Sequence, residues 1–303
     1  MNHLLLFSGI AALFLATSIF GQNLAGDEAL SKVLLAGEGW QEVASGFGFT
    51  DGACGDSEGN FYFSDLSKGV VYKVNPDGKV APFLEQGPKI SALKFGPDGR
   101  LYACTQGPKK QVIALALPSK EITVLADMVQ PNDLIVSAQG FIYFTETGKG
   151  QVTGLELKTG RIFPAATKLN APNGITLSPE GGTLAVSEYK GSNVWTYRVS
   201  VDGTLGAGAP YMTLRTPPGQ AESAGDGMTV DARGRYYVTS ALGIQMFDDT
   251  GRMGGVIARP QNKGTVSCAF AGPGHEYLYV CSSDKIYRRK TQTKGVGLVP
   301  PNR

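Results

Sequence analysis

Side chains that carry oxygen donors recur along the sequence at a nearly constant spacing. The repeated positions lie at intervals of 40, 41, 41, 53 and 41 residues and are Asp51, Ser91, Asn132, Asn173, Asp226 and Ser267. Carboxylate and amide oxygens, present at four of these positions, are the ligands that a calcium-like cation prefers. Zinc normally takes His or Cys ligands, and neither residue type occurs here. If the repeats converge, the pattern predicts a divalent-cation site formed by Asp51, Asn132, Asn173 and Asp226.

A competing interpretation assigns the same residues to tight turns. Asp51-Gly52, Asn173-Gly174 and Asp226-Gly227 are dipeptides typical of turns, for reasons unrelated to metals. Each repeat nevertheless carries a second turn signal further along, for example Ser57-Glu58-Gly59 and Pro97-Asp98-Gly99. These later groups suit the ordinary hairpin turns, which weakens the turn interpretation but leaves it open.

The elements that must position these residues are short strands. Each repeat has a polar or glycine-rich start, an alternating apolar strand, a turn with Gly and a second apolar or aromatic strand, as in TDGACGDSEGNFYFSD. A period of about 40 residues with strand-type alternation is typical of a four-stranded propeller blade. Six repeats therefore predict an all-β fold, a six-bladed β-propeller, whose innermost strands begin at one mouth of a central channel.

Three segments depart from the regular repeat. The last repeat lacks an outer strand, whereas residues 40–44 have strand-like composition, so we expect this N-terminal strand to complete the last blade and close the ring. The 53-residue interval contains a Gly/Pro-rich segment, Ser200 to Ala224, which predicts a long loop over one face. Residues 28–35 are expected to form a short helix outside the ring.

The first residues have the pattern of a cleaved leader. The stretch from Leu4 to Phe20 is apolar apart from four small or hydroxyl residues, and Gly21-Gln22 offers a small-residue cleavage site. We therefore expect a signal peptide at 1–21, a single domain at 22–303 and a secreted or periplasmic location. An uncleaved anchor is the alternative.

Export would place the four cysteines in an oxidising compartment. Cys268 and Cys281 flank the turn of the last repeat, so we expect a cross-strand disulfide between them. The alternative is that they are small buried apolar side chains. Cys54 and Cys104 fall in neighbouring blades.

Composition and charge exclude several classes of function. With 41 Gly, 18% charged residues and a net charge of +2, the chain is neither a coiled coil nor an evident nucleic-acid-binding protein. A Ser-His-Asp triad lacks a base, because the only histidines are His3 and His275 and no G-x-S-x-G elbow occurs. His275 is expected in an exposed turn. The expected partner is a small-molecule substrate, without nucleic acid and, after leader removal, without a membrane; the oligomeric state stays open.

Three motifs resemble one known family. QPNDL around Asn132, APNGITLSPEGGTL around Asn173 and GDGMTVDARGRYYV around Asp226 resemble the gluconolactonase, regucalcin (senescence marker protein) and luciferin-regenerating-enzyme-like family in order and spacing. The resemblance covers roughly residues 40–289. It implies a six-bladed propeller that holds one divalent cation through these three residues and a fourth ligand from the first repeat. The oxygen donors themselves favour calcium over zinc, manganese or magnesium. It also implies that Asp226 is the catalytic base.

Two positions depart from the family pattern. The family usually has Glu-Gly-Pro at the start of the first blade, where this chain has Asp51-Gly52-Ala53, one methylene shorter. Many lactonase members also carry a substrate-contacting Arg two residues before the PND Asn, and that position is Gln130 here. The second departure removes a positive charge from the site and therefore argues against a sugar-lactone substrate more than against a bound metal.

Other polar residues are candidates for the same mouth of the channel. Asp65, Glu146 and Glu188 share a position at the end of the second strand. Glu146 and Glu188, with Gln130, are candidate substrate-binding residues, and the alternative for these acids is a solvated strand end. Asp133, next to a candidate ligand, is expected to be a structural hydrogen-bond acceptor.

The sequence therefore predicts an exported, metal-dependent hydrolase of a lactone, either a sugar lactone or a related cyclic ester. A cation in a narrow channel can polarise the lactone carbonyl and stabilise the developing oxyanion while Asp226 activates water. Two alternatives stay open. One is a non-catalytic ligand-binding propeller with a structural ion, and the other is a phosphotriesterase-like hydrolase that uses the same metal.

Overall fold

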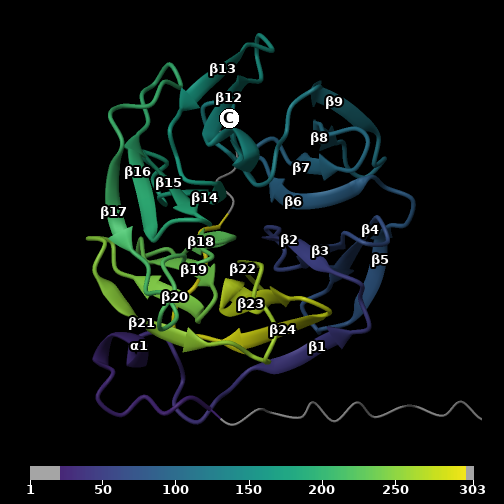
Figure 1. Cartoon of the computed structure of the whole chain (residues 1–303). Coiled ribbons are helices and arrows are strands. Elements are labelled where there is room, and N and C mark those ends of the chain that lie inside the picture. Colours follow the sequence, from purple (N-terminus) through teal and green to yellow (C-terminus); the bar gives the residue numbers. More distant parts are fainter. Residues whose placement is uncertain (1–20, 298–303) are drawn as a thin grey trace, which may run out of the picture.

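Six four-stranded antiparallel sheets surround a central channel in the computed structural model, which describes residues 21–297 (Figure 1). From the inside outward, the first three blades are β2 (Thr50–Gly55), β3 (Phe61–Asp65), β4 (Val70–Val74), β5 (Val80–Leu84); β6 (Lys89–Phe95), β7 (Leu101–Gln106), β8 (Val112–Leu115), β9 (Ile122–Ala126); β10 (Leu134–Val136), β11 (Phe141–Glu146), β12 (Gln151–Glu156), β13 (Ile162–Ala166). The last three are β14 (Pro172–Leu177), β15 (Thr183–Glu188), β16 (Asn193–Arg198), β17 (Ala209–Thr213); β18 (Met228–Val230), β19 (Tyr236–Ser240), β20 (Gly243–Phe247), β21 (Met253–Ala258); β22 (Ser267–Ala271), β23 (Tyr277–Ser282), β24 (Lys285–Lys290), β1 (Gln41–Ser45). The predicted six-bladed β-propeller is confirmed.

Neighbouring blades pack face to face through the apolar side chains of their inner strands. All five residues of β3 are buried, and Phe61 stacks on Tyr279 of the last blade with ring centroids 4.4 Å apart. Ala53, Phe63 and Ala269 fill the same interface. Each large apolar side chain removed from water contributes about 1.5–3 kcal/mol. This packing holds the inner strands firmly around the channel axis.

Glycines form the hairpin turns between the first and second strands. Gly59, Gly99, Gly140 and Gly234 have φ values of 83°, 79°, 83° and 79°. This left-handed conformation is one that glycine adopts without the steric cost of a Cβ atom. The turns assigned from the sequence to these later glycines are therefore confirmed.

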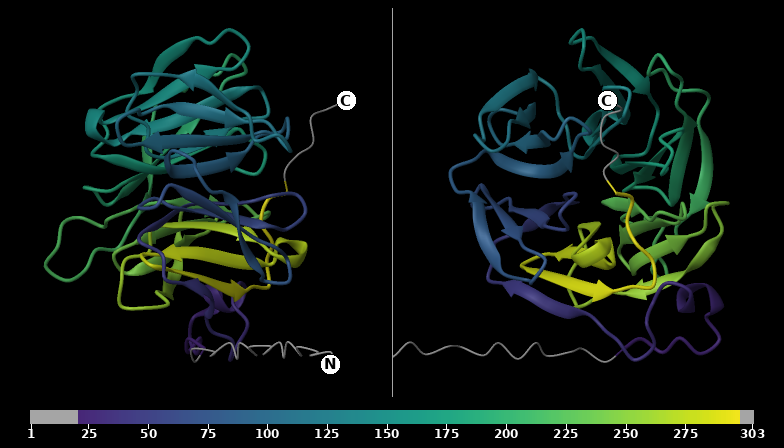
Figure 2. Two further views of the ribbon diagram at one scale, coloured as in Figure 1. Left: turned by 90° about the vertical axis from the view of Figure 1, so that its right-hand side faces the viewer. Right: turned by 180° about the vertical axis from the view of Figure 1, so that it is seen from behind.

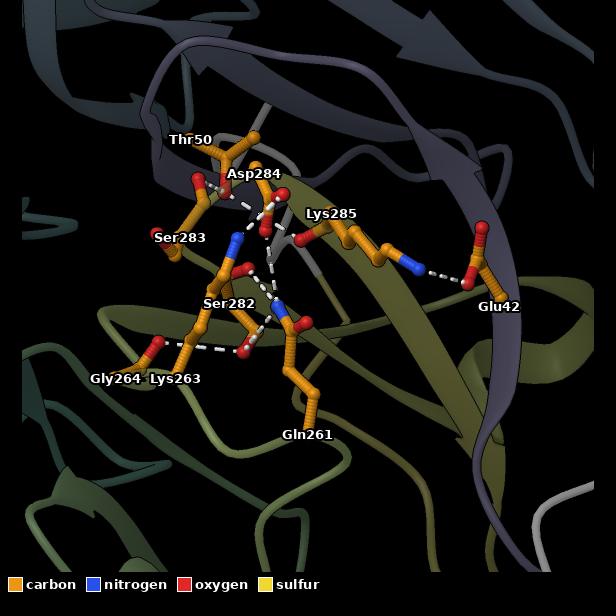
Figure 3. Close-up of polar contacts among 9 residues, drawn as sticks. All are labelled: Glu42, Thr50, Gln261, Lys263, Gly264, Ser282, Ser283, Asp284 and Lys285. Atoms are coloured by element: carbon orange, nitrogen blue, oxygen red, sulfur yellow. Dashed lines mark hydrogen bonds and ion pairs between the residues drawn. The ribbon is translucent and has the colours of Figure 1, made fainter.

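The N-terminal strand closes the ring, as predicted. β1 pairs antiparallel with β24, so that the last sheet has the order β1-β24-β23-β22. The Lys285 ammonium lies 2.8 Å from the Glu42 carboxylate across this pair (Figure 3). The Thr50 hydroxyl, at the start of the first blade, donates to the Ser283 carbonyl at 3.0 Å (Figure 3).

The connection between the fifth and sixth blades is tied to the same corner. The Gln261 amide donates to the Ser282 carbonyl at 2.7 Å, and the Ser282 hydroxyl donates to the Gly264 carbonyl at 3.2 Å (Figure 3). Lys263 and Asp284 form an ion pair at 2.7 Å. The first, fifth and sixth blades are thus joined by polar contacts where the ring closes.

A short helix packs outside the ring, as expected, although it is shorter than the predicted range. Helix α1 (Glu28–Ser31) begins after Asp27, whose side chain accepts a hydrogen bond from the Leu30 amide. The Leu30 side chain is buried in a cluster that includes Ile257 of β21. After β24 the chain crosses the rear face of the ring toward the channel (Figure 2), where Gly295 forms a β-bridge with Asp231.

The interpretation of Ser200 to Ala224 as one long loop is wrong. The segment contains β17, the outer strand of the fourth blade, which pairs antiparallel with β16. The apolar alternation in APYMT is too short to be recognised as a strand among the flanking Gly and Pro residues. The segment becomes a strand because it pairs with β16, which stabilises the extended conformation more than the local sequence does.

The predicted disulfide between Cys268 and Cys281 is also wrong, because all four cysteines are free and buried. β22 and β23 pair Ser267, not Cys268, with Cys281. Successive strand residues point to opposite faces of a sheet. Cys268 therefore packs toward Tyr237 and Ile244, and Cys281 packs toward Phe61 and Phe63. Small buried apolar side chains, the alternative interpretation, describe both residues.

The predicted signal peptide lies outside the described residues except for Gly21. Within residues 21–297, no helix has the length and apolar character needed to cross a membrane.

Replacement of Trp40 by Ala should destabilise the ring closure. The Trp40 ring is 3% exposed, and its Nε1 donates to the Ala258 carbonyl of the fifth blade at 2.7 Å. We expect Trp40→Ala to lower the free energy of unfolding by about 3–5 kcal/mol, as for other buried aromatic deletions. Urea denaturation measures the loss, and Trp40→Phe, which keeps most of the packing, is the control. A loss below about 1 kcal/mol would contradict this account of closure.

Candidate metal centre

All six repeat positions line one small cavity on the channel axis. The residues around it include Asp51, Ser91, Asn132, Asn173, Asp226 and Ser267. Each lies in, or just before, the innermost strand of a different blade. The structure therefore brings together the four predicted ligands, Asp51, Asn132, Asn173 and Asp226, although they are far apart in the sequence.

The glycines that follow two of these residues allow neighbouring inner strands to approach closely. A Cβ atom on Gly174 would overlap the Asp226 carbonyl oxygen, and one on Gly227 would lie 2.7 Å from the Ser267 Cα. Asp51 lies in β2 and Asn173 lies in β14, so neither forms a tight hairpin turn. The hairpin-turn interpretation is therefore wrong for Asp51-Gly52 and Asn173-Gly174, and Gly174 and Gly227 allow close packing between blades.

Burial and mutual repulsion disfavour ionisation of the carboxyl groups at the centre. Burial raises the pKa of Asp51 to about 7, and the negative charge of Asp133 adds to this effect. Burial, with the charges of Asp51 and Asp133, raises the pKa of Asp226 well above its usual value. Two carboxyl groups with raised pKa values that line one small cavity favour a bound positive charge.

The donor set fits a hard divalent cation. Within the described residues, no three His, Cys, Asp or Glu side chains form a group that could hold a metal. A cation held by Asp51 and Asp226 would therefore need the amide oxygens of Asn132 and Asn173. Two carboxylates and two amide carbonyls, with water in the open positions, match the all-oxygen coordination of calcium.

Asp133 has the structural role expected from the sequence. Its carboxylate accepts hydrogen bonds from its own strand, at the Leu134 amide (2.8 Å), and from the next blade, at the Ile175 amide (3.3 Å). The side chain thus joins the third and fourth blades beside the candidate ligands.

Lys94 is a site residue that the sequence motifs did not identify. It lies in β6 and lines the axial cavity, where its ammonium donates to the Ala53 carbonyl at 3.4 Å. Its positive charge lowers the pKa values of Asp51 and Asp133, although burial outweighs this effect. The available signal was a lysine between the apolar residues Leu93 and Phe95 near the end of an inner strand, KISALKF.

The acids at the ends of the second strands bind backbone amides beside the channel mouth. Glu146 accepts from the Gln130 amide at 2.8 Å, Glu188 from the Asn170 amide at 2.7 Å and Asp65 from the Gly48 amide at 3.0 Å. All three are buried, so the interpretation as solvated strand ends is wrong. Burial alone would raise the pKa of Glu146, but hydrogen bonds from Lys149, Thr153 and other groups hold it below its usual value.

The predicted substrate-binding residues are not gathered in the axial cavity. Glu146 and Glu188 are absent from its lining, because their carboxylates are turned to the loops that precede β10 and β14. Gln130 is exposed two residues before Asn132, and its main chain is held by Glu146. Of the three predicted substrate-binding residues, Gln130 is the one with an exposed side chain.

A second, larger cavity of about 370 Å³ occupies the opposite end of the channel. Turn residues after the first strands line it, including Pro97, Ala138 and His275, together with Gly295 to Gly297. His275 is half-buried and its Nε2 lies 2.7 Å from the Asp56 carbonyl oxygen, so its placement in an exposed turn is corrected.

The fold and the site define a six-bladed propeller with an acid-and-amide centre on its axis. Residues 49–284 match the family model described as the SMP-30/Gluconolactonase/LRE-like region, and the chain belongs to this family.

Curated relatives and solved structures agree with this membership. A gluconolactonase from Zymomonas mobilis is 26% identical, over 84% of this chain and 81% of its own length. Lactonase drp35 from Staphylococcus aureus is 24% identical, over 82% of this chain and 83% of its own length. The structure of regucalcin, a calcium-binding protein from Agrobacterium tumefaciens, superposes with a TM-score of 0.69 at 15% identity, covering 84% of this chain and 94% of that one.

Calcium should bind more weakly to the metal-free protein as the pH falls. Asp51 and Asp226 act as ligands only when ionised, and burial raises the pKa of both. Each proton released on binding weakens the affinity about tenfold per unit fall in pH. Isothermal titration calorimetry between pH 8 and 5.5 measures this, and a pH-independent affinity would contradict the assignment of these ligands.

The same shifts have a consequence for the stability of the metal-free protein. The folded-state pKa of Asp51, about 7, exceeds the ordinary value near 4, so the folded state binds the extra proton between these pH values. The contribution of Asp51 to stability should therefore fall as the pH rises through this range. Thermal unfolding in the presence of chelator, compared with Asp51→Asn, measures the contribution; an identical pH dependence in both proteins would contradict it.

Proposed function

We propose that this protein hydrolyses a lactone at the axial centre, with one divalent cation, calcium in preference to other ions, held by Asp51, Asn132, Asn173 and Asp226. The observation that carries the proposal is the convergence of these four side chains on one cavity. Membership of the gluconolactonase-like family and the names of the lactonase relatives support the reaction class. The calcium-binding regucalcin neighbour supports the choice of ion.

The bound cation would polarise the lactone carbonyl and stabilise negative charge on its oxygen. Asp226 is the candidate general base: its carboxylate lines the cavity and, ionised beside the bound cation, would accept the proton of the attacking water. Asn132 and Asn173 line the same cavity and would supply amide oxygens, and the glycine after Asn173 lets the next blade bring Asp226 beside it.

The substrate would enter at the mouth that carries Gln130. This side chain is exposed beside Asn132, and the amide of the same residue is fixed by Glu146. An uncharged amide can hydrogen-bond a hydroxyl or a carbonyl but offers no positive charge to an anionic group. We therefore propose a neutral lactone, either a sugar lactone or another cyclic ester, as the substrate class.

Export is part of the same proposal. The apolar stretch from Leu4 to Phe20, followed by Gly21-Gln22, has the features of a signal peptide. The mature protein would then act as a secreted or periplasmic enzyme. Mass spectrometry of the protein recovered from its native host would find a mature N-terminus near residue 22 if the leader is removed, and an intact Met1 or Asn2 would contradict cleavage.

Hydrolysis of a lactone panel by metal-stripped, calcium-reloaded protein tests the function. We expect pH-stat turnover that depends on added calcium and that falls by about 10²–10⁴-fold in Asp226→Asn, the range typical for loss of a general base. Asp202→Asn is the matched control, because this carboxylate is exposed in a turn and bonds only to nearby Thr204 groups. Full activity in Asp226→Asn would overturn the mechanism.

The same protein distinguishes the alternative functions. Tight calcium binding without opening of any lactone would favour a ligand-binding propeller, a reading that the uncharged Gln130 supports. Calcium-dependent hydrolysis of fluorophosphates in place of lactones would indicate a phosphotriesterase.

A further inference from the structure

The last two residues of every second strand form a repeated polar pair. The pairs end β3, β7, β11, β15, β19 and β23 and are Ser64-Asp65, Thr105-Gln106, Thr145-Glu146, Ser187-Glu188, Thr239-Ser240 and Cys281-Ser282. The first member is always Ser, Thr or Cys. The six blades otherwise differ in sequence, yet each has a small hydrogen-bond donor at this position. This recurrence indicates that the donor has the same structural role in each blade.

Most of these first members donate to a main-chain carbonyl of the next blade. Thr145 donates to the Asn173 carbonyl at 2.6 Å, Ser187 to the Asp226 carbonyl at 2.9 Å and the Cys281 thiol to the Asp51 carbonyl at 3.7 Å. The acceptors are thus the carbonyls of three candidate metal ligands.

The fourth candidate ligand is held in a related way. Thr105 donates within its own blade, to the Lys109 carbonyl. The Asn132 carbonyl instead accepts from the Ser91 hydroxyl at 2.7 Å, and Gln106 donates to Ser91 at 2.9 Å. Because Ser91 belongs to the preceding blade, all four candidate ligands have their carbonyl held by a side chain from the blade before.

We propose that Cys281, Ser91, Thr145 and Ser187 are positioning residues of the metal centre, and we call their hydrogen bonds to the ligand carbonyls inter-blade latches. The proposal rests on the function proposed above. A hydrogen bond to the carbonyl of a residue fixes the peptide plane next to its Cα and so restricts where its side chain points. Metal ligands must be held to within about 0.5 Å, and groups that orient them typically contribute 10–100-fold to affinity.

Ser187 shows how one latch serves two ligands. Its Oγ accepts from the Gly174 amide at 2.9 Å, directly after Asn173, while it donates to the Asp226 carbonyl of the next blade. Ser187 is fully buried. It therefore sets the position of Asn173 relative to Asp226 and not only the packing of two sheets.

The chain contains its own matched control. Ser64 donates to the Ile90 carbonyl at 2.6 Å. It is a buried hydroxyl at the same strand position, but its acceptor is not a candidate ligand. If latches only join blades, loss of any of these hydroxyls should have the same effect. If latches position ligands, loss of the Thr145 or Ser187 hydroxyl should also weaken calcium binding.

Calcium titration of the full-length, metal-stripped protein by calorimetry tests the proposal, with thermal unfolding of the metal-free variants in parallel. We expect Thr145→Val and Ser187→Ala to weaken calcium binding by about 10–100-fold. Ser64→Ala should lower the unfolding temperature comparably but change the affinity by less than about threefold. Thr145→Ser, which keeps the donor, should restore the affinity.

Two exchanges of similar volume test the latches with little disturbance of packing. Ser187→Cys replaces a strong donor with a weak one and should weaken calcium binding, whereas Cys281→Ser should keep or strengthen it by shortening the latch to Asp51. Equal affinities in the wild type, Ser187→Cys and Thr145→Val would overturn the proposal, as would an equal loss of affinity in the Ser64→Ala control. A wild-type protein that binds no divalent cation would instead overturn the proposed function, and the positioning role with it.

Discussion

The close approach of six inner strands around one axis is the constraint on which the rest of the structure depends. Gly174 and Gly227 permit this approach, because a side chain at either position would meet the main chain of the next blade. The apolar interfaces between blades, such as that between Phe61 and Tyr279, hold the strands at this spacing. The result is a narrow channel in which polar side chains from different blades meet without room for independent solvation.

That narrowness gives the acids of the channel their unusual properties. Asp51 and Asp226 are only partly exposed and lie near Asp133, and the loss of solvation together with this repulsion raises their pKa values. By contrast, Asp65 and Glu146 are fully buried but accept several hydrogen bonds and have lowered pKa values. Asp65 and Glu146 therefore stabilise the fold in their ionised form, whereas a bound cation would be needed to stabilise the ionised form of Asp51 and Asp226.

Much of the fold and of the centre could be predicted from the sequence, because both follow from the repeat. The period placed Asp51, Asn132, Asn173 and Asp226 at one end of the inner strands, and the structure places them around one cavity. The strand that closes the ring was predictable because a propeller leaves no blade incomplete.

The remaining features depend on tertiary contacts that a linear pattern does not carry. β17 is recognisable only beside β16, and the cysteines were misassigned because one residue of register moves a side chain to the other face. Glu146 and Glu188 have the residue type of substrate ligands, but their hydrogen bonds direct them to the backbone of their own blades. Lys94 belongs to no recognisable sequence motif, and its electrostatic effect on the carboxyl groups can be inferred only from its position beside the axial cavity.

A crystal structure of the protein grown with calcium tests the central claim most directly. The account predicts one cation on the axis, with side-chain oxygens of Asp51, Asn132, Asn173 and Asp226 at about 2.3–2.6 Å. A calcium ion bound elsewhere, or side chains of these four residues turned away from an axial ion, would contradict it.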